Sequence, residues 1–434
     1  MSWRPEYILL IFFCAFLNYY SAIFIKQTLD ARRRKLLLII SVILNLSVIF
    51  IFKYLDFFSG VINSAASLSG SNMNLPMANL ILPVGISFFT FHTMSYTIDV
   101  YRDEIPLEKH IGYFILYVVF WPMLLAGPIE RGSHLIPQFR KKYRWDLDRT
   151  VWGCQRIAFG LFKKVVIADR LAPLVQSAFN EPQNYGAYAA FTGAVLFSIQ
   201  IFCDFSGYCD IALGCAQILD FDLFENFNQP YRAQSIREFW SRWHMSLSRW
   251  FRDYVYIPLG GNRQGKLMQY RNLLITFLVS GLWHGANFTY IIWGGMHGLF
   301  QIAGTETAGA KSTVYRATGL AKFPWLIKAQ QVVITFLLAT FAWIFFRARN
   351  LDQAFEVIGR IFSFRPVGGM AEIMLGSGPL KFSITLFLLA VLAATALLPR
   401  KLNFRGSRLI TLAYLVLLVV FGNNGVGEFI YFQF

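Results

Sequence analysis

The scarcest feature of this 434-residue sequence is charge: Asp, Glu, Lys and Arg make up 15% of it, whereas soluble domains hold about a quarter. Hydrophobic residues reach 56% and aromatic residues 17%, and a soluble globule with that surplus would aggregate. Cysteine is scarce too: the five residues are odd in number, lie mostly in apolar stretches and show no metal-ligand spacing. These shortages exclude a soluble enzyme and a disulfide framework, and no metal is expected.

Acidic residues are the scarcer charged class, since 24 of them against 40 Lys and Arg give a net charge of +16. Such a surplus can indicate nucleic-acid binding, but in a chain this apolar it is better explained by basic loops on the cytoplasmic side of a membrane. The basic run at residues 32–35 follows the first apolar stretch, which predicts a cytoplasmic first loop and an external N-terminus. We expect contacts with membrane lipids and no nucleic-acid partner.

Long apolar runs are abundant, and several approach the roughly 20 residues that a helix needs to cross a ~30 Å hydrocarbon core. None shows the alternation of β-barrel strands, so the backbone must satisfy its hydrogen bonds within helices. The first run lacks a small-residue cleavage site and is read as a retained span. The predicted fold is all-α, a polytopic transmembrane helical bundle forming one integral-membrane domain over residues 1–434. The predicted spans are Tyr7–Ile25, Leu36–Phe52, Leu80–Thr97, Ile111–Leu125, Ala187–Ile201, Asn272–Trp293, Val332–Phe346, Ile384–Leu398 and Leu409–Phe421.

One predicted span conflicts with simple alternation. If Ile111–Leu125 crossed the membrane, the basic stretch at residues 131–149 would lie outside, against the preference of Lys and Arg for the cytoplasm. Either this segment is re-entrant, or a further crossing exists around Phe57–Leu68. Gly127 and Pro128 favour a break, since irregular backbone at membrane depth requires surrounding protein or a cavity.

Three segments place polar groups in apolar sequence, where an ionisable side chain costs roughly 2.5 to 3.5 kcal/mol on insertion scales and usually marks a site. In the first, Gln200–Gly214, the polar residues either cap a helix end or line the wall of a cavity. The candidate tunnel residues in this segment are Asp204, Ser206, Tyr208 and Asp210.

The second segment, Ser235–Gly261, predicts one amphipathic helix at the membrane interface or tucked into the protein. Between Arg232 and Arg271 eight Arg or Lys stand against two acidic residues, which suits anionic lipid heads or the phosphates of a nucleotide-bearing donor. The candidate contacts are Arg242, Arg249 and Arg252. The apolar face holds Trp240, Trp243, His244, Leu247, Trp250, Phe251 and Tyr254, and the opposite face holds Glu238, Arg242 and Arg249.

The third segment, Ser280–Gly298, places His284 inside an apolar run. Burial favours the neutral imidazole, which leaves a free base at neutral pH. Gly281 and Gly285, one helical turn apart, allow close approach of a ligand or only of a neighbouring helix. His297 lies about 220° around the helix from His284, so the two are not paired.

At these segments the chain resembles the membrane-bound O-acyltransferase (MBOAT) superfamily, and within it the bacterial branch that includes alginate O-acetyltransferases and the acyltransferase of lipoteichoic acid D-alanylation. The likeness spans most of the chain and is strongest over residues 80–300. The matching stretches are ILPVGISFFTFHTMSYTIDVYR from Ile81, AGPIERGSHLIPQF from Ala126, DFSGYCDIALG from Asp204, FWSRWHMSLSRWFRDYVYIPLGGNR from Phe239, SGLWHGANFTYIIWGGMHG from Ser280 and FIYFQF from Phe429.

The resemblance implies a ring of helices around a central funnel or tunnel, with the family's catalytic histidine at His284 and a second important histidine at His244. As the base for attack of a hydroxyl on a thioester, a histidine typically contributes about 10² to 10⁴ in rate. His284 could instead carry the acyl group covalently, and His244 could orient the thioester or share the proton. Asn287 is a candidate donor to the developing oxyanion, and Trp240 and Trp283 complete the predicted tunnel lining. Asp204 and Asp210 could hold the base or shape the tunnel.

The resemblance also implies the reaction partners. No bound cofactor is expected; the co-substrate is an acyl thioester, either acetyl-CoA or a carrier-protein thioester, and the acyl group crosses the bacterial inner (plasma) membrane. The predicted function is O-acetyl transfer to a cell-surface exopolysaccharide or peptidoglycan, through an extracytoplasmic SGNH-like transferase or a polysaccharide synthesis and export complex. The alternatives are D-alanyl transfer from an acyl carrier protein to teichoic acid, a polytopic transporter, and a structural subunit of an export machine.

Overall fold

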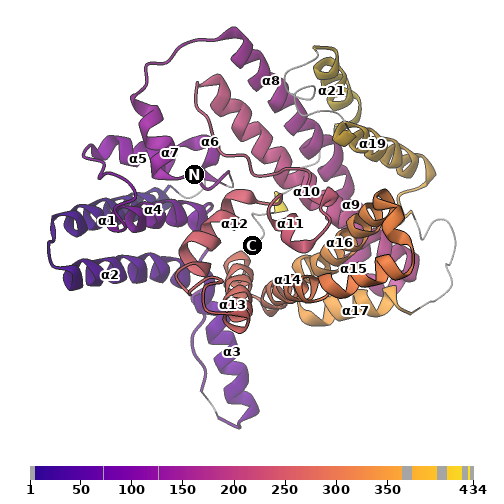
Figure 1. Cartoon of the computed structure of the whole chain (residues 1–434), viewed down its shortest axis with the longest axis horizontal. Coiled ribbons are helices and arrows are strands. Elements are labelled where there is room, and N and C mark those ends of the chain that lie inside the picture. The colour runs from indigo at the N-terminus through magenta and orange to yellow at the C-terminus, as the bar shows by residue number, and fades with distance from the viewer. Residues whose placement is uncertain are drawn as a thin grey trace. The chain divides into compact units, whose positions relative to one another are not determined.

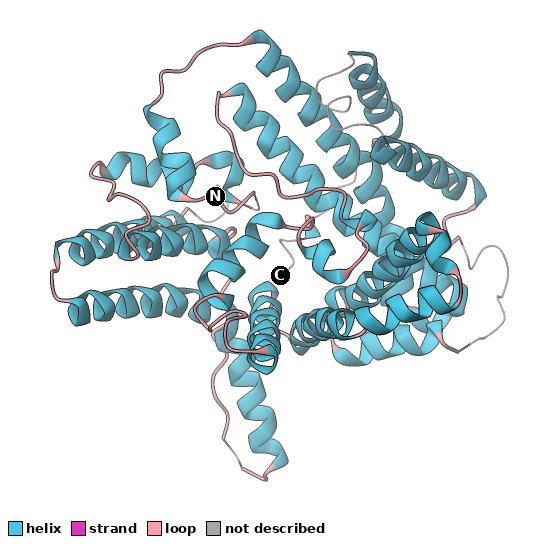
Figure 2. Cartoon of the chain, viewed as in Figure 1, coloured by secondary structure: helices cyan, strands magenta, loops and turns pink. Residues whose placement is uncertain are grey.

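Helices are the only regular secondary structure among the residues that the computed structural model describes, which are 5–71, 73–125, 127–363, 374–397, 408–422 and 429–430 (Figures 1 and 2). The all-α prediction is confirmed. The chain divides into two compact units, Met1–Asp146 with Leu219–Phe224, and Leu147–Ile218 with Glu225–Phe434. The single domain over residues 1–434 and the ring around a funnel stay predictions.

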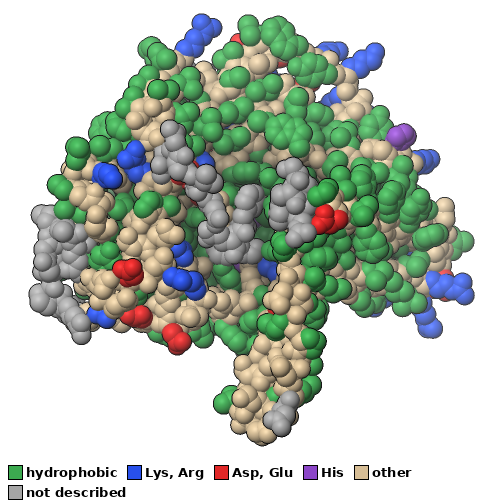
Figure 3. Space-filling view, turned by 180° about the vertical axis from the view of Figure 1, so that it is seen from behind, with side chains coloured by type: hydrophobic (Ala, Val, Ile, Leu, Met, Phe, Trp, Pro, Cys, Tyr) green, Lys and Arg blue, Asp and Glu red, His purple; other side chains and the backbone are tan. Residues whose placement is uncertain are grey.

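Within the described ranges, four helical segments are long and apolar enough to cross a membrane. Many of their large hydrophobic side chains are exposed, for example Leu9 at 68% and Phe24 at 55%, and hydrophobic side chains spread over much of the face in Figure 3. Apolar surface on this scale suits contact with lipid rather than water. The four segments are Tyr7–Gln27, Ala31–Leu68, Ala187–Ile218 and Pro324–Arg347.

The first unit contains three helices that pack together, α1 (Tyr7–Gln27), α2 (Ala31–Ile49) and α4 (Ile86–Tyr101) (Figure 1). Buried amides join the first two helices, because Asn18 and Asn45 exchange hydrogen bonds of 2.8 and 3.1 Å. Such polar contacts hold helices together where lipid supplies no hydrophobic driving force. The other elements of this unit are η1 (Phe50–Tyr54), α3 (Leu55–Leu68), α5 (Ile111–Val119), α6 (Trp121–Leu124), α7 (Gly132–Leu135) and η2 (Ile136–Arg140).

The extra crossing considered around Phe57–Leu68 is not a separate helix, since α3 continues α2 through the π turn η1 as one segment of 38 residues. The predicted span Ile111–Leu125 does not form one helix either. It is broken at Phe120, where ψ is 102°. The nine residues of α5 extend about 14 Å, half of the ~30 Å core. Pro122 lacks the amide hydrogen that would continue a helix, so α6 begins anew; the re-entrant alternative stays a prediction.

The second unit contains α8 (Leu147–Leu161) and α10 (Ala187–Ile218), which pack closely along two pairs of glycines. A Cβ on Gly214 would lie 2.6 Å from the carbonyl oxygen of Gly153, and one on Gly207 would lie 2.8 Å from that of Gly160. Only glycine lets the two backbones approach so closely. The other elements of the second unit, apart from those described below, are η3 (Phe162–Ala168), α9 (Asp169–Asn180), η4 (Pro182–Asn184), η5 (Pro230–Arg232), α15 (Ala308–Ala317), η7 (Leu320–Lys322), α16 (Pro324–Arg347), α17 (Leu351–Ile361), α19 (Pro379–Leu397) and α21 (Arg408–Phe421).

The prediction of one span over Asn272–Trp293 is wrong. Two helices meet there, α13 (Lys266–His284) and α14 (Phe288–Glu306). Asn287 caps α14, because its side chain accepts a hydrogen bond of 3.0 Å from an amide at the start of the helix. A Cβ on Gly281 would lie 2.2 Å from a carbonyl oxygen of α14, so close helix packing, one of the two alternatives for this glycine, is confirmed.

The single amphipathic helix predicted over Ser235–Gly261 is also wrong. The segment forms α11 (Ile236–Trp240), α12 (Met245–Phe251) and the π turn η6 (Arg252–Tyr256). Between α11 and α12 the backbone takes a left-handed conformation at His244, with φ of 42°, which ends regular helical periodicity. The predicted apolar face is nevertheless buried, apart from the half-buried Tyr254.

Candidate active site

His284 is the last residue of α13 and is buried, with 4% of its surface exposed. Aromatic rings enclose the imidazole: the ring centroids of Trp283, Trp293 and Phe346 lie 4.8, 5.0 and 5.2 Å from it, each edge to face. Such contacts favour one ring orientation. The predicted burial is confirmed, but His284 lies at the turn between two helices rather than in the middle of a span.

His244 lies between α11 and α12 and is fully buried. Its Nδ1 lies 3.3 Å from Oδ1 of Asn226, and the edge of the Phe205 ring approaches it at 4.7 Å between centroids. The Trp283 ring lies 6.4 Å from the His244 ring and also contacts His284. One indole therefore contacts both predicted catalytic histidines.

A cavity of about 250 Å³ lies among α11, α12, η6, α13 and α14. The predicted tunnel residue Trp240 and the predicted donor contact Arg252 both line it, and so does Ser280, one helical turn before His284. The imidazole of His284 is not part of the lining. The remaining polar side chains of the wall are Arg237, Ser248, Tyr256, Gln269, Tyr270, Thr276, Gln301 and Thr305.

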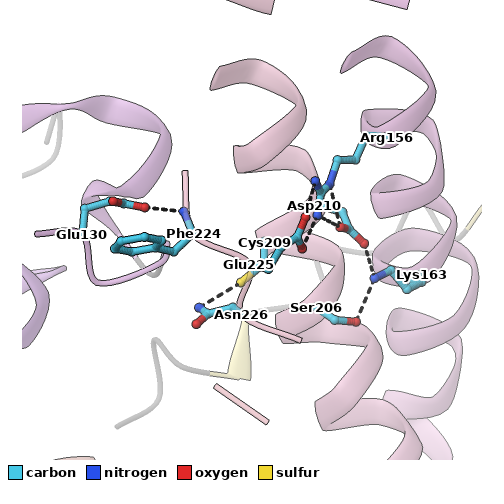
Figure 4. Close-up of polar contacts among 9 residues, drawn as sticks. All are labelled: Glu130, Arg156, Lys163, Ser206, Cys209, Asp210, Phe224, Glu225 and Asn226. Carbon is cyan, nitrogen blue, oxygen red and sulfur yellow. Dashed lines mark hydrogen bonds and ion pairs between the residues drawn. The ribbon is translucent and has the colours of Figure 1, made fainter. Parts of the chain in front are cut away.

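Asp210 is the centre of a buried ionic network in the second unit (Figure 4). Lys163 forms an ion pair with Asp210 and donates to Ser206 at 2.9 Å. Arg156 donates to Asp210 at 3.0 Å and pairs through both terminal nitrogens with Glu225, at 2.8 and 2.7 Å. Two cations and two carboxylates thus compensate one another, as buried charges must be compensated. The side chains of Arg156, Lys163 and Asp210 are buried, whereas that of Glu225 is 38% exposed.

Asp204 has different partners. It forms an ion pair of 2.7 Å with Lys164 and accepts a hydrogen bond of 2.8 Å from the amide of Ile430. The Phe429 ring lies 5.2 Å from the ring of Tyr208. These contacts fall in the interior of α10, which continues to Ile218, so the alternative of a capped helix end is wrong. Residues 431–434 of the FIYFQF stretch lie outside the described residues.

A second cavity, of about 100 Å³, adjoins the network around Asp210. Ser206 and Asp210 line it, as predicted for a polar cavity wall, together with Lys163 and Asn226. Asp204 and Tyr208 are not among its lining residues. The four predicted residues of α10 therefore face two environments.

The three arginines predicted to contact the acyl donor have different surroundings. Arg242 forms an ion pair of 2.6 Å with Glu238, and Arg249 donates to the carbonyl oxygen of Met245 at 3.3 Å. Of the three arginines, Arg252 lines the larger cavity.

Both the oxygen and the nitrogen of the Asn287 side-chain amide form hydrogen bonds. Besides capping α14, its Nδ2 donates to the carbonyl oxygen of Arg349 at 2.7 Å. These bonds use the amide oxygen and one of the two hydrogens of Nδ2, and a role for Asn287 as donor to an oxyanion stays a prediction.

Sequence reasoning did not single out Arg156, Lys163, Lys164 or Asn226. The lysines carried a usable signal, because they interrupt the apolar stretch FGLFKKVVIA from Phe159, where a cation needs a partner. Asn226 carried none, since it lies outside any helix and its side-chain partners lie 17 to 20 positions away in the chain.

Comparison with known proteins assigns this sequence to a family. The sequence model of the membrane-bound O-acyltransferase (MBOAT) family matches residues 7–347. The chain belongs to this family. Among its MBOAT relatives, a probable alginate O-acetylase, AlgI, of Pseudomonas aeruginosa is 41% identical over 363 residues, which cover 83% of this chain and 67% of the relative.

Two further MBOAT relatives act on other envelope polymers, according to their names. A peptidoglycan O-acetyltransferase of Helicobacter pylori is 36% identical over 82% of this chain and 70% of its own. A teichoic acid D-alanyltransferase of Streptococcus thermophilus is 30% identical over 58% of this chain and 65% of its own. The predictions of an acyltransferase and of a multi-pass membrane protein are confirmed, which sets aside the transporter and the structural subunit.

Proposed function

We propose that this MBOAT protein transfers an acetyl group from a cytoplasmic thioester to a cell-surface polysaccharide, directly or through an extracytoplasmic transferase. Greater similarity to an alginate O-acetylase and a peptidoglycan O-acetyltransferase than to a teichoic acid D-alanyltransferase supports acetyl as the acyl group. The observation that carries the proposal is the His284 imidazole, buried among aromatic rings beside the α13–α14 turn. The bacterial inner membrane is the compartment where such a donor and such an acceptor meet on opposite sides.

His284 acts as the general base in this proposal. Its imidazole takes the proton of the attacking hydroxyl while the new carbon–oxygen bond forms, and the carbon–sulfur bond then breaks. The proton passes to the leaving thiolate, so no net charge is created. His244 shares the proton through its own ring. The aromatic enclosure excludes water, which would otherwise hydrolyse the thioester.

The larger cavity is the proposed entry for the donor. Arg237 and Arg252 offer cationic side chains in its lining that suit the phosphate of a coenzyme A or phosphopantetheine group. The cavity extends to Ser280, one turn from His284, so a thioester arm bound in it would approach the base. The donor carries its own acyl group, and no resident cofactor is required.

The test is His284→Ala in living cells. We expect O-acetylation of the surface polymer to fall at least 100-fold, because a positioned base typically contributes about 10² to 10⁴ in rate, while the amount of protein in the membrane stays unchanged. Base-released acetate from purified polymer is the measurement. Lys311→Ala, on the exposed face of α15, is the matched control and should retain acetylation.

Normal acetylation in the His284→Ala strain would refute the assignment. Incubating membranes with acetyl-labelled coenzyme A, or with an acetylated carrier protein, identifies the donor. Transfer of D-alanine in place of acetate would favour the D-alanyl alternative, which the similarity to a teichoic acid D-alanyltransferase keeps as the second candidate.

A further inference from the structure

The start of α12 depends on a residue from outside the helix. His244 precedes the first turn without a side-chain cap of its own. Oδ1 of Asn226 instead accepts hydrogen bonds from the backbone amide of Ser246 at 3.1 Å and from its hydroxyl at 2.7 Å. The carbonyl oxygen of Asn226 accepts from the amide of Met245 at 3.0 Å. Asn226 is completely buried, so this cap is shielded from competing water.

These contacts determine which way round the Asn226 amide lies. A backbone N–H can only donate, so the atom that faces the amide of Ser246 must be the oxygen. The nitrogen Nδ2 then faces Sγ of Cys209, at 3.5 Å. The orientation of Asn226 is therefore set by the backbone of α12 and does not depend on His244.

The protonation of His244 follows from that orientation. Its Nδ1 lies 3.3 Å from the same Oδ1, which has lone pairs and no hydrogen. If Nδ1 carried no hydrogen, its lone pair would face a lone pair of Oδ1, and the two would repel each other. If Nδ1 carries the hydrogen, the contact is a hydrogen bond in which Nδ1 donates to Oδ1. In the neutral ring the basic nitrogen is then Nε2, because the partner of one ring nitrogen sets the state of the other.

Two aromatic rings also contact the imidazole. Phe205 approaches from α10 and Trp283 from α13. The titratable groups on the far side of the Asn226 amide are Cys209 and the next residue of α10, Asp210, which is paired with Lys163. The Asn226 amide thus separates His244 from the charged network.

We propose that Asn226 is a positioning residue that keeps the His244 proton on Nδ1 and so presents Nε2 as the nitrogen that shares the proton of the transfer reaction. The inference rests on the proposed function, in which His244 acts beside His284. Asn226 touches neither donor nor acceptor. It acts through the orientation and the tautomer of His244.

Asn226→Asp separates this role from capping. Aspartate caps a helix as well as asparagine does, so the variant keeps the cap and changes only the charge beside His244. A carboxylate beside Nδ1 stabilises the protonated imidazolium, and the base becomes available only at higher pH. We expect the acid limb of the pH–rate profile for acetyl transfer to move to higher pH by about one to three units. Ser246→Ala keeps the hydrogen bond from the backbone amide of residue 246 to Asn226 and keeps the contact of Asn226 with His244. It should leave the acid limb of the pH–rate profile unchanged.

A direct readout covers the case in which Asn226→Asp does not insert into the membrane. Solid-state nitrogen NMR of histidine-labelled wild-type protein in lipid, assigned with His244→Gln, should find the His244 proton on Nδ1. A proton on Nε2, or a pH profile of Asn226→Asp that coincides with the wild type, would overturn the proposal. Loss of the proposed function has a different signature, because wild-type membranes would then transfer no acyl group while the NMR signal still reports the tautomer.

Discussion

At the residue scale, one buried carboxylate of the second unit pairs with two cations. Asp210 contacts both Lys163 and Arg156, whereas Glu225 contacts Arg156. Removing one member of a buried pair leaves an uncompensated charge and costs about 3 to 5 kcal/mol. Asp210 is the more demanding position because two cations depend on it.

We therefore expect Asp210→Asn to lower the free energy of unfolding by about 3 to 5 kcal/mol, and Lys163→Met to cost less, since Asp210 keeps Arg156. Asp103→Asn is the matched control, because Asp103 also pairs with two cations, Lys26 and Arg34, but its side chain is 53% exposed; each such surface pair contributes about 0 to 1 kcal/mol. Urea unfolding in detergent micelles measures all three. Equal losses for Asp210→Asn and Asp103→Asn would contradict the assignment.

A second residue-scale prediction concerns pH. In the first unit His134 Nδ1 lies 2.7 Å from Glu130, and the His134 ring stacks on Phe224 at 4.3 Å. The hydrogen bond to Glu130 raises the pKa of His134 above its ordinary value, against the opposing effect of burial. Because the folded pKa exceeds the unfolded one, the stabilisation is complete below about pH 6.5 and is lost as the pH rises through the folded pKa.

The thermal midpoint of the wild type should accordingly fall on going from about pH 6 to pH 9, and His134→Gln should show a smaller fall. Differential scanning fluorimetry of the two proteins at matched detergent concentration measures it. If the thermal midpoints of the wild type and the variant fell in parallel with rising pH, the His134–Glu130 pair would not control the pH dependence of stability.

At the element scale, the packing of α8 against α10 brings Arg156 of α8 to Asp210 of α10. The facing glycines of the two helices let the backbones approach until a Cβ on Gly214 would lie 2.6 Å from a carbonyl oxygen. Gly214→Ala should therefore force the helices apart and cost about 1 to 3 kcal/mol. Gly304→Ala in α14 has nothing within 4 Å of the new methyl group and gains helix propensity.

Unfolding midpoints of the two variants test this packing. We expect a lower midpoint for Gly214→Ala and an unchanged or higher one for Gly304→Ala. A Gly214→Ala protein as stable as the wild type would mean that α8 and α10 tolerate a wider separation than the structure has.

The breaks on either side of the candidate site also belong to this scale. His284 ends α13 and His244 directly precedes α12, so each histidine lies at the end of a helix rather than on a helix face. Hydrophobicity continues through both breaks, and a window of apolar residues cannot distinguish one long helix from two short ones. The buried faces were predicted correctly because burial follows from residue type, whereas helix continuity depends on caps and contacts.

At the scale of the whole molecule, the chain is a multi-pass membrane acyltransferase of the MBOAT family. The helices that meet the length and hydropathy needed for a span occur in both compact units. Both predicted catalytic histidines, both cavities and the ionic network lie in the second unit. The chemistry we propose is accordingly concentrated in Leu147–Ile218 and Glu225–Phe434.

The sequence by itself determined that the protein is helical and embedded in a membrane, because composition and run length decide whether a backbone can be satisfied in lipid. It also determined the family, since several long motifs occur in order, and it predicted the two histidines. Only the tertiary structure decided that Asp210 joins Lys163 and Arg156, that Asn226 contacts His244, and that three predicted helices are each broken. Those facts depend on contacts between residues far apart in the chain, and local periodicity carries no information about such contacts.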